Sequence, residues 1–326
     1  MISSLVRAGL QNRILFVVVF IAWANLSMVS DSRPVRLASK DPVVSLEVDG
    51  RARSYAVHLP SGRPPSSPVP LVLVLHGGGG TAASAVWMTG FNEKADKHGF
   101  IAVYPQGTGV FPTWNSGNCC GYALRNKVDD VAFIRAMLDK LEHTYRIDRR
   151  RVFATGISNG GMMAFRLACE LPDRIAAIAP VAAAFNLDSC ADGEPVSVLM
   201  INGTADQHVP YGGGTGKKSL HPRMDKPVSY AISYWVERNG CSSEPLTSMS
   251  ASGKIVIDRY RGGRDGTEVV LYTINGGGHA WPGRRNPRVL ADEPNTREIS
   301  ATDVIWDFFQ AHPKRPVTFT PQDNRS

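Results

Sequence analysis

The most restrictive feature of this sequence is a continuous apolar run, LVLVL at residues 71–75, followed by His76. A strand with one solvated face alternates polar and apolar residues, whereas a strand buried on both faces of a parallel sheet does not. Parallel strands also need long crossover connections, and helical and strand-like segments follow this run in turn. The chain is therefore predicted to be an α/β protein, with helices on both faces of a mostly parallel, twisted sheet.

The predicted elements continue this alternation along the chain. Helices are expected over about 82–98, 128–145, 160–170, 228–239 and 300–312, and strands over 100–105, 151–156, 175–181, 197–203, 254–260 and 268–274. Upstream, 43–48 and 52–59 flank Asp49-Gly50, a dipeptide that favours hairpin turns, so an antiparallel N-terminal hairpin is predicted. Nothing between Val43 and His312 resembles a linker, which predicts one domain over 43–312 and a flexible tail over 313–326.

The N-terminus has the pattern of an export signal. Arg7 and Arg13 precede an apolar run of 11 residues, 14–24, whereas a membrane-spanning helix needs about 20 residues. Ala22-Trp23-Ala24 offers the small residues that a signal peptidase needs. We predict a signal peptide over 1–24, a linker over 25–42, and a secreted protein, extracellular or periplasmic, without stable membrane association after cleavage. An uncleaved anchor is the alternative.

The basic charge of the chain gives little sign of a nucleic-acid partner. Its 36 Lys and Arg against 29 Asp and Glu leave a net charge of +7. Nucleic-acid-binding proteins concentrate such charge on one stripe or helix. Here it is spread over short pieces such as 125–127, 149–151 and 283–285, so no nucleic-acid binding is predicted.

A candidate nucleophile follows the predicted strand over 151–156. Gly156-Ile157-Ser158-Asn159-Gly160 has the G-x-S-x-G pattern and lies between that strand and a predicted helix. A serine on such a sharp turn needs small neighbours two residues away, and this context makes the pattern specific. The arrangement predicts a nucleophile elbow at Ser158.

A serine nucleophile needs a histidine base and a carboxylate that orients it. On a sheet of this kind they follow the serine in the order carboxylate, then histidine, at the ends of later strands. Asp206 follows the strand over 197–203, and His279 follows the strand over 268–274. Ser158, Asp206 and His279 are therefore the predicted triad, with His208 a neighbour of the site.

Acyl transfer also needs backbone N–H donors for the oxyanion of the transition state. His76-Gly77-Gly78-Gly79-Gly80 directly follows the first parallel strand and matches the loop type that supplies one donor. Gly78 is the predicted first donor, with Gly77 as the alternative, and Asn159 is the second. A phosphate-binding loop is disfavoured because no Lys-Ser/Thr pair follows the glycines.

Two tryptophans are candidates for substrate contact. Trp114 and Trp281 lie near glycines in predicted loops at the same end of the sheet as the triad. Either ring could stack on an acyl or aromatic group of the substrate, and packing of the surrounding loops is the alternative role.

The chain has five cysteines, a small odd number that suits an exported protein with a few disulfides. Adjacent Cys119 and Cys120 would form a strained ring, so each is expected to pair with a distant partner among Cys169, Cys190 and Cys241. At least one cysteine must then be left over or paired between chains. No C-x2-C pair accompanies histidines at ligand spacing, so no metal site is predicted.

Several motifs together resemble a known family. LHGGGG, TWNSGNCCG, VFATGISNGGMMAFRLACELPDRIAAIAPVAA, NGTADQHVPYGGG and GGGHAWPG are similar to the secreted polyhydroxybutyrate depolymerase and feruloyl or acetylxylan esterase group of the α/β-hydrolases. The resemblance runs from about Leu71 to Phe309. It implies a serine esterase without a cofactor that uses the same three triad residues.

The predicted function is hydrolysis of carboxylic esters through an acyl-enzyme. The substrate would be a polymeric or oligomeric ester, either a polyhydroxybutyrate-type polyester or a feruloyl or acetyl ester of a polysaccharide. One alternative is a peptidase of the prolyl-oligopeptidase type, although the roughly 40 residues before the first parallel strand cannot form the β-propeller of those enzymes. The other is a secreted binding protein of the same fold without catalysis.

Overall fold

The computed structural model describes residues 41–61, 67–221 and 223–315. The predicted signal peptide, the linker up to residue 40 and residues 316–326 of the predicted tail lie outside these ranges.

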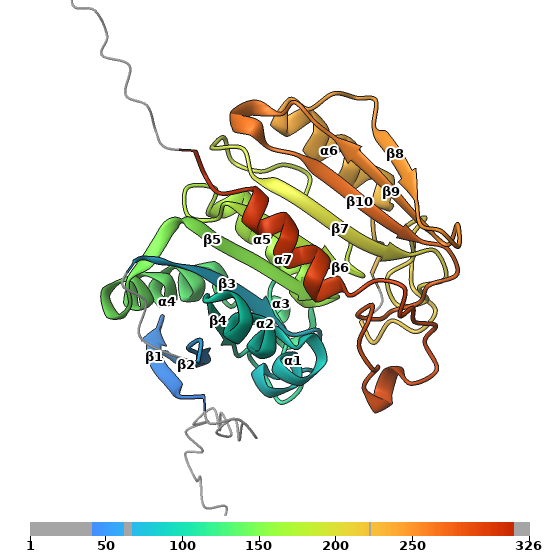
Figure 1. Cartoon of the computed structure of the whole chain (residues 1–326). Helices are drawn as coiled ribbons and strands as arrows, with labels where there is room; N and C mark the ends of the chain where they lie inside the picture. The colour runs from blue at the N-terminus through green and yellow to red at the C-terminus, as the bar shows by residue number, and fades with distance from the viewer. Residues whose placement is uncertain (1–40, 62–66, 222, 316–326) are drawn as a thin grey trace, which may run out of the picture. The chain divides into compact units, whose positions relative to one another are not determined.

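The described residues form a ten-stranded sheet in the order β1-β2-β4-β3-β5-β6-β7-β10-β9-β8 (Figure 1). The six strands from β4 to β10 in this order are parallel, and two antiparallel strands lie at each edge. This arrangement confirms the mostly parallel sheet and the N-terminal hairpin. The strands are β1 (Val43–Val48), β2 (Arg51–His58), β3 (Val69–Leu75), β4 (Ile101–Pro105), β5 (Ile147–Ile157), β6 (Ala177–Val181), β7 (Ser197–Gly203), β8 (Leu246–Met249), β9 (Ile255–Tyr260) and β10 (Val269–Ile274).

Helices cover both faces of the sheet, as predicted. One face packs against α4, α5 and α6, and the other against α1, α2 and α7 (Figure 1). The helices are α1 (Ala82–Thr89), α2 (Phe91–His98), α3 (Gly121–Arg125), α4 (Asp130–Thr144), α5 (Asn159–Glu170), α6 (Val228–Asn239) and α7 (Ala301–Ala311), with short 3-10 turns η1 (Arg264–Gly266) and η2 (Arg288–Leu290).

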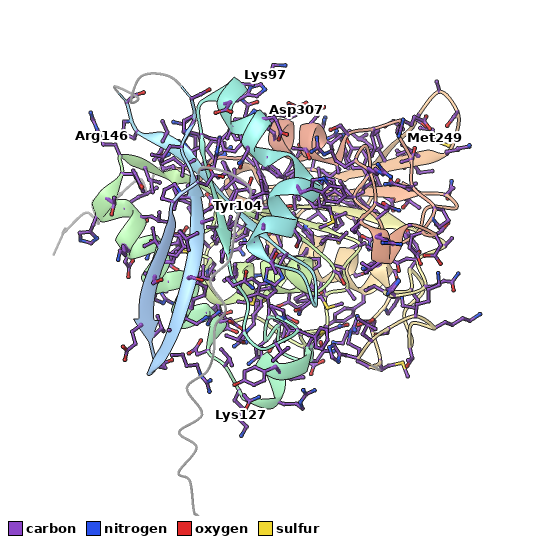
Figure 2. The ribbon with its side chains drawn as sticks, turned by 90° about the horizontal axis from the view of Figure 1, so that it is seen from below. Lys97, Tyr104, Lys127, Arg146, Met249 and Asp307 are labelled. Carbon is purple, nitrogen blue, oxygen red and sulfur yellow. A yellow bond between two sulfur atoms is a disulfide. The ribbon has the colours of Figure 1, made fainter. Side chains whose placement is uncertain are left out.

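Strand β3 shows why its sequence is apolar throughout. All seven of its residues are buried, with Leu71 and Leu73 in the core on one face and Val72 in the core on the other. The neighbouring strand β4 is buried in the same way, and Tyr104 lies inside the molecule in Figure 2, where Lys97 extends outward. The core therefore has two layers, one on each side of the sheet.

Three elements differ from the predicted ones. The helix expected over 82–98 is broken at Gly90, whose φ of 68° is left-handed and ends α1. Helix α3 was not expected because it has only five residues. Strand β8 was also not expected, since all four of its residues are exposed and give no apolar pattern. No helix in the described part of the chain is both long and apolar enough to cross a membrane.

The disulfides differ in part from the predicted pairing. Cys169, at the end of α5, is paired with Cys190 in the loop after β6. Cys119 is paired with Cys120, and Cys241 is a half-buried free thiol. The expectation that Cys119 and Cys120 each have a distant partner is wrong, because the fold brings two of the three distant cysteines together with each other.

Candidate active site

Ser158 lies on a sharp turn between β5 and α5. Its φ of 57° and ψ of −126° place a non-glycine residue in a strained conformation, and its side chain is half-buried. A Cβ on Gly156 would lie 2.6 Å from the carbonyl oxygen of Leu75, and a Cβ on Gly160 would overlap the same atom. The two glycines are therefore what allows the elbow to pack against the end of β3.

Asp206 and His279 meet at the ends of the neighbouring parallel strands β7 and β10. Asp206 Oδ2 accepts a hydrogen bond of 2.7 Å from His279 Nδ1, and both side chains are buried. The other oxygen, Oδ1, accepts the backbone N–H groups of His208 and Val209 at 2.8 and 2.9 Å. Because the carboxylate only accepts, the proton lies on Nδ1, which leaves His279 Nε2 as an acceptor.

Ser158 is not hydrogen-bonded to this pair. Its hydroxyl makes no hydrogen bond to His279 within the described residues. Val209 from the Asp206 loop nevertheless belongs to one buried cluster with Met162, in the first turn of α5, and with Ala183 after β6. The loop that holds Asp206 therefore packs against the helix that begins at Ser158. Catalytic hydrogen bonds are often long in free enzymes and shorten when substrate binds.

The two predicted oxyanion donors lie beside each other. A Cβ on Gly78 would be 3.9 Å from Asn159 Cβ, and one on Gly77 would be 3.5 Å from Ser158 Cβ. Within the part of the chain that the structure describes, neither the Gly78 nor the Asn159 backbone N–H donates a hydrogen bond. Both groups are thus free to bind an anionic oxygen.

His76 fixes the loop that carries Gly78. Its Nε2 accepts the Gly107 N–H at 2.9 Å, so its proton lies on Nδ1, which donates to the Gly77 carbonyl at 2.8 Å. Burial lowers the pKa of His76 to about 4, so the ring is neutral at pH 7. Since the Gly77 carbonyl belongs to the same peptide unit as the Gly78 N–H, this bond sets the direction of that donor.

Trp114 joins the two oxyanion loops instead of contacting substrate. Its indole N–H donates to the His76 carbonyl at 2.9 Å. Its backbone exchanges two hydrogen bonds with the Asn159 side chain, at 2.7 and 3.0 Å. The ring has 0% exposure, so the hypothesis that it stacks on substrate is contradicted.

Trp281 is also buried, with 1% exposure. Its indole N–H donates to Thr302 Oγ1 at 3.0 Å, and its ring packs edge-on against Phe91. The substrate-stacking hypothesis is contradicted here too, because the loop folds the ring inward against α2 and α7. Both tryptophans therefore have the packing role that was the alternative.

One further residue near His279 has no signature in the sequence. Glu293, in the segment between β10 and α7, accepts the His279 backbone N–H at 3.1 Å and the Lys218 ammonium at 2.8 Å. It lies in irregular structure, where no periodicity marks a buried carboxylate. Within the described ranges, no group of three His, Cys, Asp or Glu side chains is arranged to hold a metal ion.

Comparison with known proteins gives the same family that the motifs indicated. A family model described as Esterase PHB depolymerase matches residues 53–193. NocK of Nocardia uniformis subsp. tsuyamanensis, which is named as an esterase, is 34% identical over 286 residues that cover 80% of each chain. Feruloyl esterase B of Piromyces equi is 31% identical over 244 residues, covering 70% of this chain and 42% of that protein.

A solved structure shows the same fold. An acetyl xylan esterase from Aspergillus awamori matches with a TM-score of 0.59 at 16% identity, covering 82% of this chain and 99% of that one. The predicted α/β-hydrolase fold is confirmed by this likeness and by the strand order. The protein is an ester hydrolase, and the chain belongs to the esterase PHB depolymerase family.

Proposed function

We propose that this ester hydrolase works through an acyl-enzyme at Ser158. Ser158 Oγ attacks the carbonyl carbon of the ester while His279 Nε2 takes the hydroxyl proton. The oxyanion that forms accepts hydrogen bonds from the Gly78 and Asn159 N–H groups. His279 then gives its proton to the departing alkoxide, which leaves as the alcohol. In the second half of the reaction, His279 takes a proton from water, which attacks the acyl carbon. The proton then returns to Ser158 Oγ, and the acid is released.

The observation that carries this proposal is the buried Asp206–His279 hydrogen bond of 2.7 Å. It fixes the ring tautomer, leaves Nε2 without a hydrogen bond among the described residues, and provides a negative charge beside the imidazolium that forms during the reaction. A catalytically inactive binding protein would have no need for this geometry together with two free oxyanion donors.

Exposed apolar side chains near the site offer contacts for the apolar parts of an ester substrate. Val110 and Phe111 are 94% and 76% exposed at the tip of the turn over 108–113, which adjoins the oxyanion loop through a Gly79 N–H to Pro112 carbonyl bond of 2.8 Å. Leu220 and Met224 are 80% and 72% exposed on the segment around His221, which packs against Gly121.

We propose a hydroxyalkanoate polyester, its oligomers, or a feruloyl or acetyl ester of a polysaccharide as substrate, because the matching family model and relatives carry the names of such esterases. Hydrolysis rates on polyhydroxybutyrate, its oligomers, methyl ferulate and acetylated xylan would choose among them. Comparable hydrolysis of a peptide amide would contradict an ester substrate.

We also propose that the chain is exported through residues 1–24. The Cys169–Cys190 disulfide supports an oxidising compartment. N-terminal sequencing of the exported protein is expected to begin near Asn25, and an intact N-terminus would contradict cleavage.

Replacement of Ser158 by Ala tests the mechanism. We expect the rate of hydrolysis of p-nitrophenyl butyrate to fall by roughly 10⁴- to 10⁶-fold, because no other group can form the acyl-enzyme. Ser248, exposed on β8, provides the matched control, and Ser248→Ala should keep the full rate. A fluorophosphonate probe should label the wild type and the control but not Ser158→Ala. Retained hydrolysis in Ser158→Ala would rule out the proposed nucleophile.

A further inference from the structure

We infer that Glu293 is a positioning residue for His279, and that its charge, opposed by that of Lys218, shifts the pH at which the reaction fails on the acid side. This inference rests on the proposed function, in which His279 is the general base.

His279 is held from two directions by two different carboxylates. Asp206 binds its side chain, and Glu293 Oε2 accepts its backbone N–H at 3.1 Å. The Glu293 side chain is 1% exposed, so its carboxylate is as deeply placed as that of Asp206. Its second oxygen, Oε1, accepts the Lys218 ammonium at 2.8 Å. Removing Lys218 would leave a buried carboxylate without its ammonium partner.

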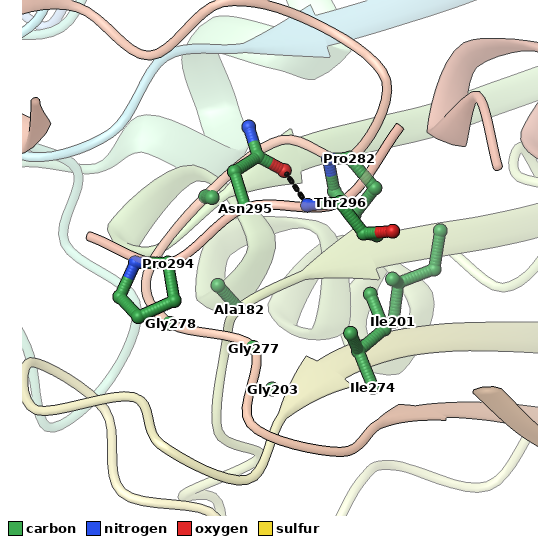
Figure 3. A pocket seen from close by; sticks show the side chains of 11 residues that line it. Ala182, Ile201, Gly203, Ile274, Gly277, Gly278, Pro282, Pro294, Asn295 and Thr296 are labelled. Atoms are coloured by element: carbon green, nitrogen blue, oxygen red, sulfur yellow. Dashed lines mark hydrogen bonds between the residues drawn. The ribbon is translucent and has the colours of Figure 1, made fainter. Parts of the chain in front are cut away.

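The backbone around Glu293 leaves the carboxylate little freedom. The Gly278 N–H donates to the Pro294 carbonyl at 2.8 Å, and the Asn286 side chain donates to the Glu293 carbonyl at 2.9 Å. Figure 3 shows Pro294 beside Gly278. The cavity that Gly277, Gly278 and Pro294 help to line has a volume of about 10 Å³. The segment that contains Glu293 is thus held by a backbone hydrogen bond against the loop that contains His279.

The lack of a side chain at Gly278 leaves room for the Glu293 carboxylate beside the His279 N–H. A Cβ on Gly278 would lie 2.6 Å from Glu293 Oε2 and 2.7 Å from Pro294 Cδ. Any other residue at 278 would push the carboxylate away from the His279 N–H. One of the three glycines before His279 therefore has a specific role in seating Glu293.

The charged and titratable groups around His279 come from two segments. The loop after β7 contributes Asp206, His208 and Lys218, and the segment before α7 contributes Asp292 and Glu293. The His208 ring lies 4.7 Å from the His279 ring, and its Nε2 is 3.4 Å from Glu293 Oε1. Asp292 is 72% exposed and 2.7 Å from the Lys218 ammonium.

Two of these groups have shifted pKa values. Burial, and then the charge of His279, lowers the pKa of His208, which favours a neutral ring. Burial alone would raise the pKa of Glu293, but the hydrogen bonds from Lys218 and from the His279 N–H lower it below its ordinary value. The negative Glu293 carboxylate therefore contacts the His279 main chain, and the positive Lys218 ammonium lies on the other oxygen of that carboxylate.

The test uses two substitutions that change the local charge in opposite directions. Glu293→Gln keeps an oxygen for the His279 N–H but removes the negative charge, which destabilises the imidazolium. The acid limb of the kcat/KM profile should move to lower pH by about 0.5 to 1 unit. Lys218→Gln removes the positive charge, and the limb should move to higher pH by a similar amount.

Asp292→Asn is the matched control, since it removes a negative charge one residue away at an exposed position. It should move the acid limb by less than about 0.2 unit, because solvent screens its charge. Glu293→Ala, which also loses the N–H acceptor, should lower kcat further than Glu293→Gln, whose amide restores that bond. Thermal unfolding of each variant reports whether the fold is kept. If the Glu293 variants do not fold, the shift of the acid limb in Lys218→Gln alone decides the inference.

The outcomes separate this inference from the proposed function. Activity that survives in Ser158→Ala would overturn the function itself. Activity that depends on Ser158, with acid limbs that stay in place or move in the same direction in Glu293→Gln and Lys218→Gln, would overturn the role of Glu293 alone.

Discussion

Two buried histidines, His76 and His279, follow parallel strands of the same sheet and differ in what their second ring nitrogen does. Both use Nδ1 as a donor, His76 to the Gly77 carbonyl and His279 to the Asp206 carboxylate. In His76, Nε2 is occupied by the Gly107 N–H. In His279, Nε2 makes no hydrogen bond to any described residue.

The difference supports the proposed role of His279, and not His76, as the base. His76 faces a neutral carbonyl and has no free acceptor, so protonation would cost a hydrogen bond and bury an unpaired charge. His279 faces a carboxylate that stabilises the protonated ring, and its free nitrogen can take the proton. Burial alone does not distinguish the two residues, because they are 0% and 4% exposed.

The strongest test of this contrast removes each ring in turn. His279→Gln should lower kcat/KM for p-nitrophenyl butyrate by roughly 10⁴- to 10⁶-fold, because the base is lost. His76→Asn keeps a donor for the Gly77 carbonyl and should lower it by about tenfold at most, through a less rigid oxyanion loop. If both variants fold and lose kcat/KM to the same extent, His279 is not distinguished from His76 as the base.

The contrast also predicts how stability depends on pH. The pKa of His76 is about 4 in the folded protein and 6.5 when unfolded, so the unfolded chain takes up the proton first as the pH falls. The stabilisation is complete above pH 6.5 and is lost as the pH falls towards 4. Between pH 7 and 4.5 this residue should lower the free energy of unfolding by about 2 kcal/mol.

Urea unfolding at both pH values would measure this loss. His76→Asn should reduce the difference between the two pH values by that amount, whereas His143→Asn, at an exposed position on α4, should leave it unchanged. An unchanged pH dependence in His76→Asn would show that the ring is not held neutral.

The smallest expected effect concerns the tryptophan that ties His76 to Asn159. Trp114→Phe removes the indole N–H that binds the His76 carbonyl, and kcat should fall about tenfold with KM unchanged, since the bond supports only the transition state. Trp281→Phe makes the same chemical change where the indole binds Thr302, and kcat should change less than about twofold. Equal kcat values in the two variants would show that the Trp114 indole N–H does not support the oxyanion donors.

The sequence predicted those features that depend on local patterns. The apolar run at β3, the order of Ser158, Asp206 and His279 after their strands, and the hairpin at Asp49-Gly50 each follow from spacing within a few residues. The direction in which Trp114 and Trp281 point depends on packing between segments far apart in the chain. The same is true of Glu293, which reaches His279 from an irregular segment, and of the Cys169–Cys190 pair.

The close fit between Gly278 and Glu293 has a consequence for how such a site can change over evolutionary time. A side chain on residue 278 would occupy the space of the Glu293 carboxylate, so the cost of any mutation at one position depends on the residue present at the other. The two positions form an epistatic pair, although 15 places in the numbering separate them. A lineage that loses the carboxylate is then free to replace the glycine, and it can regain the carboxylate only after the glycine has returned.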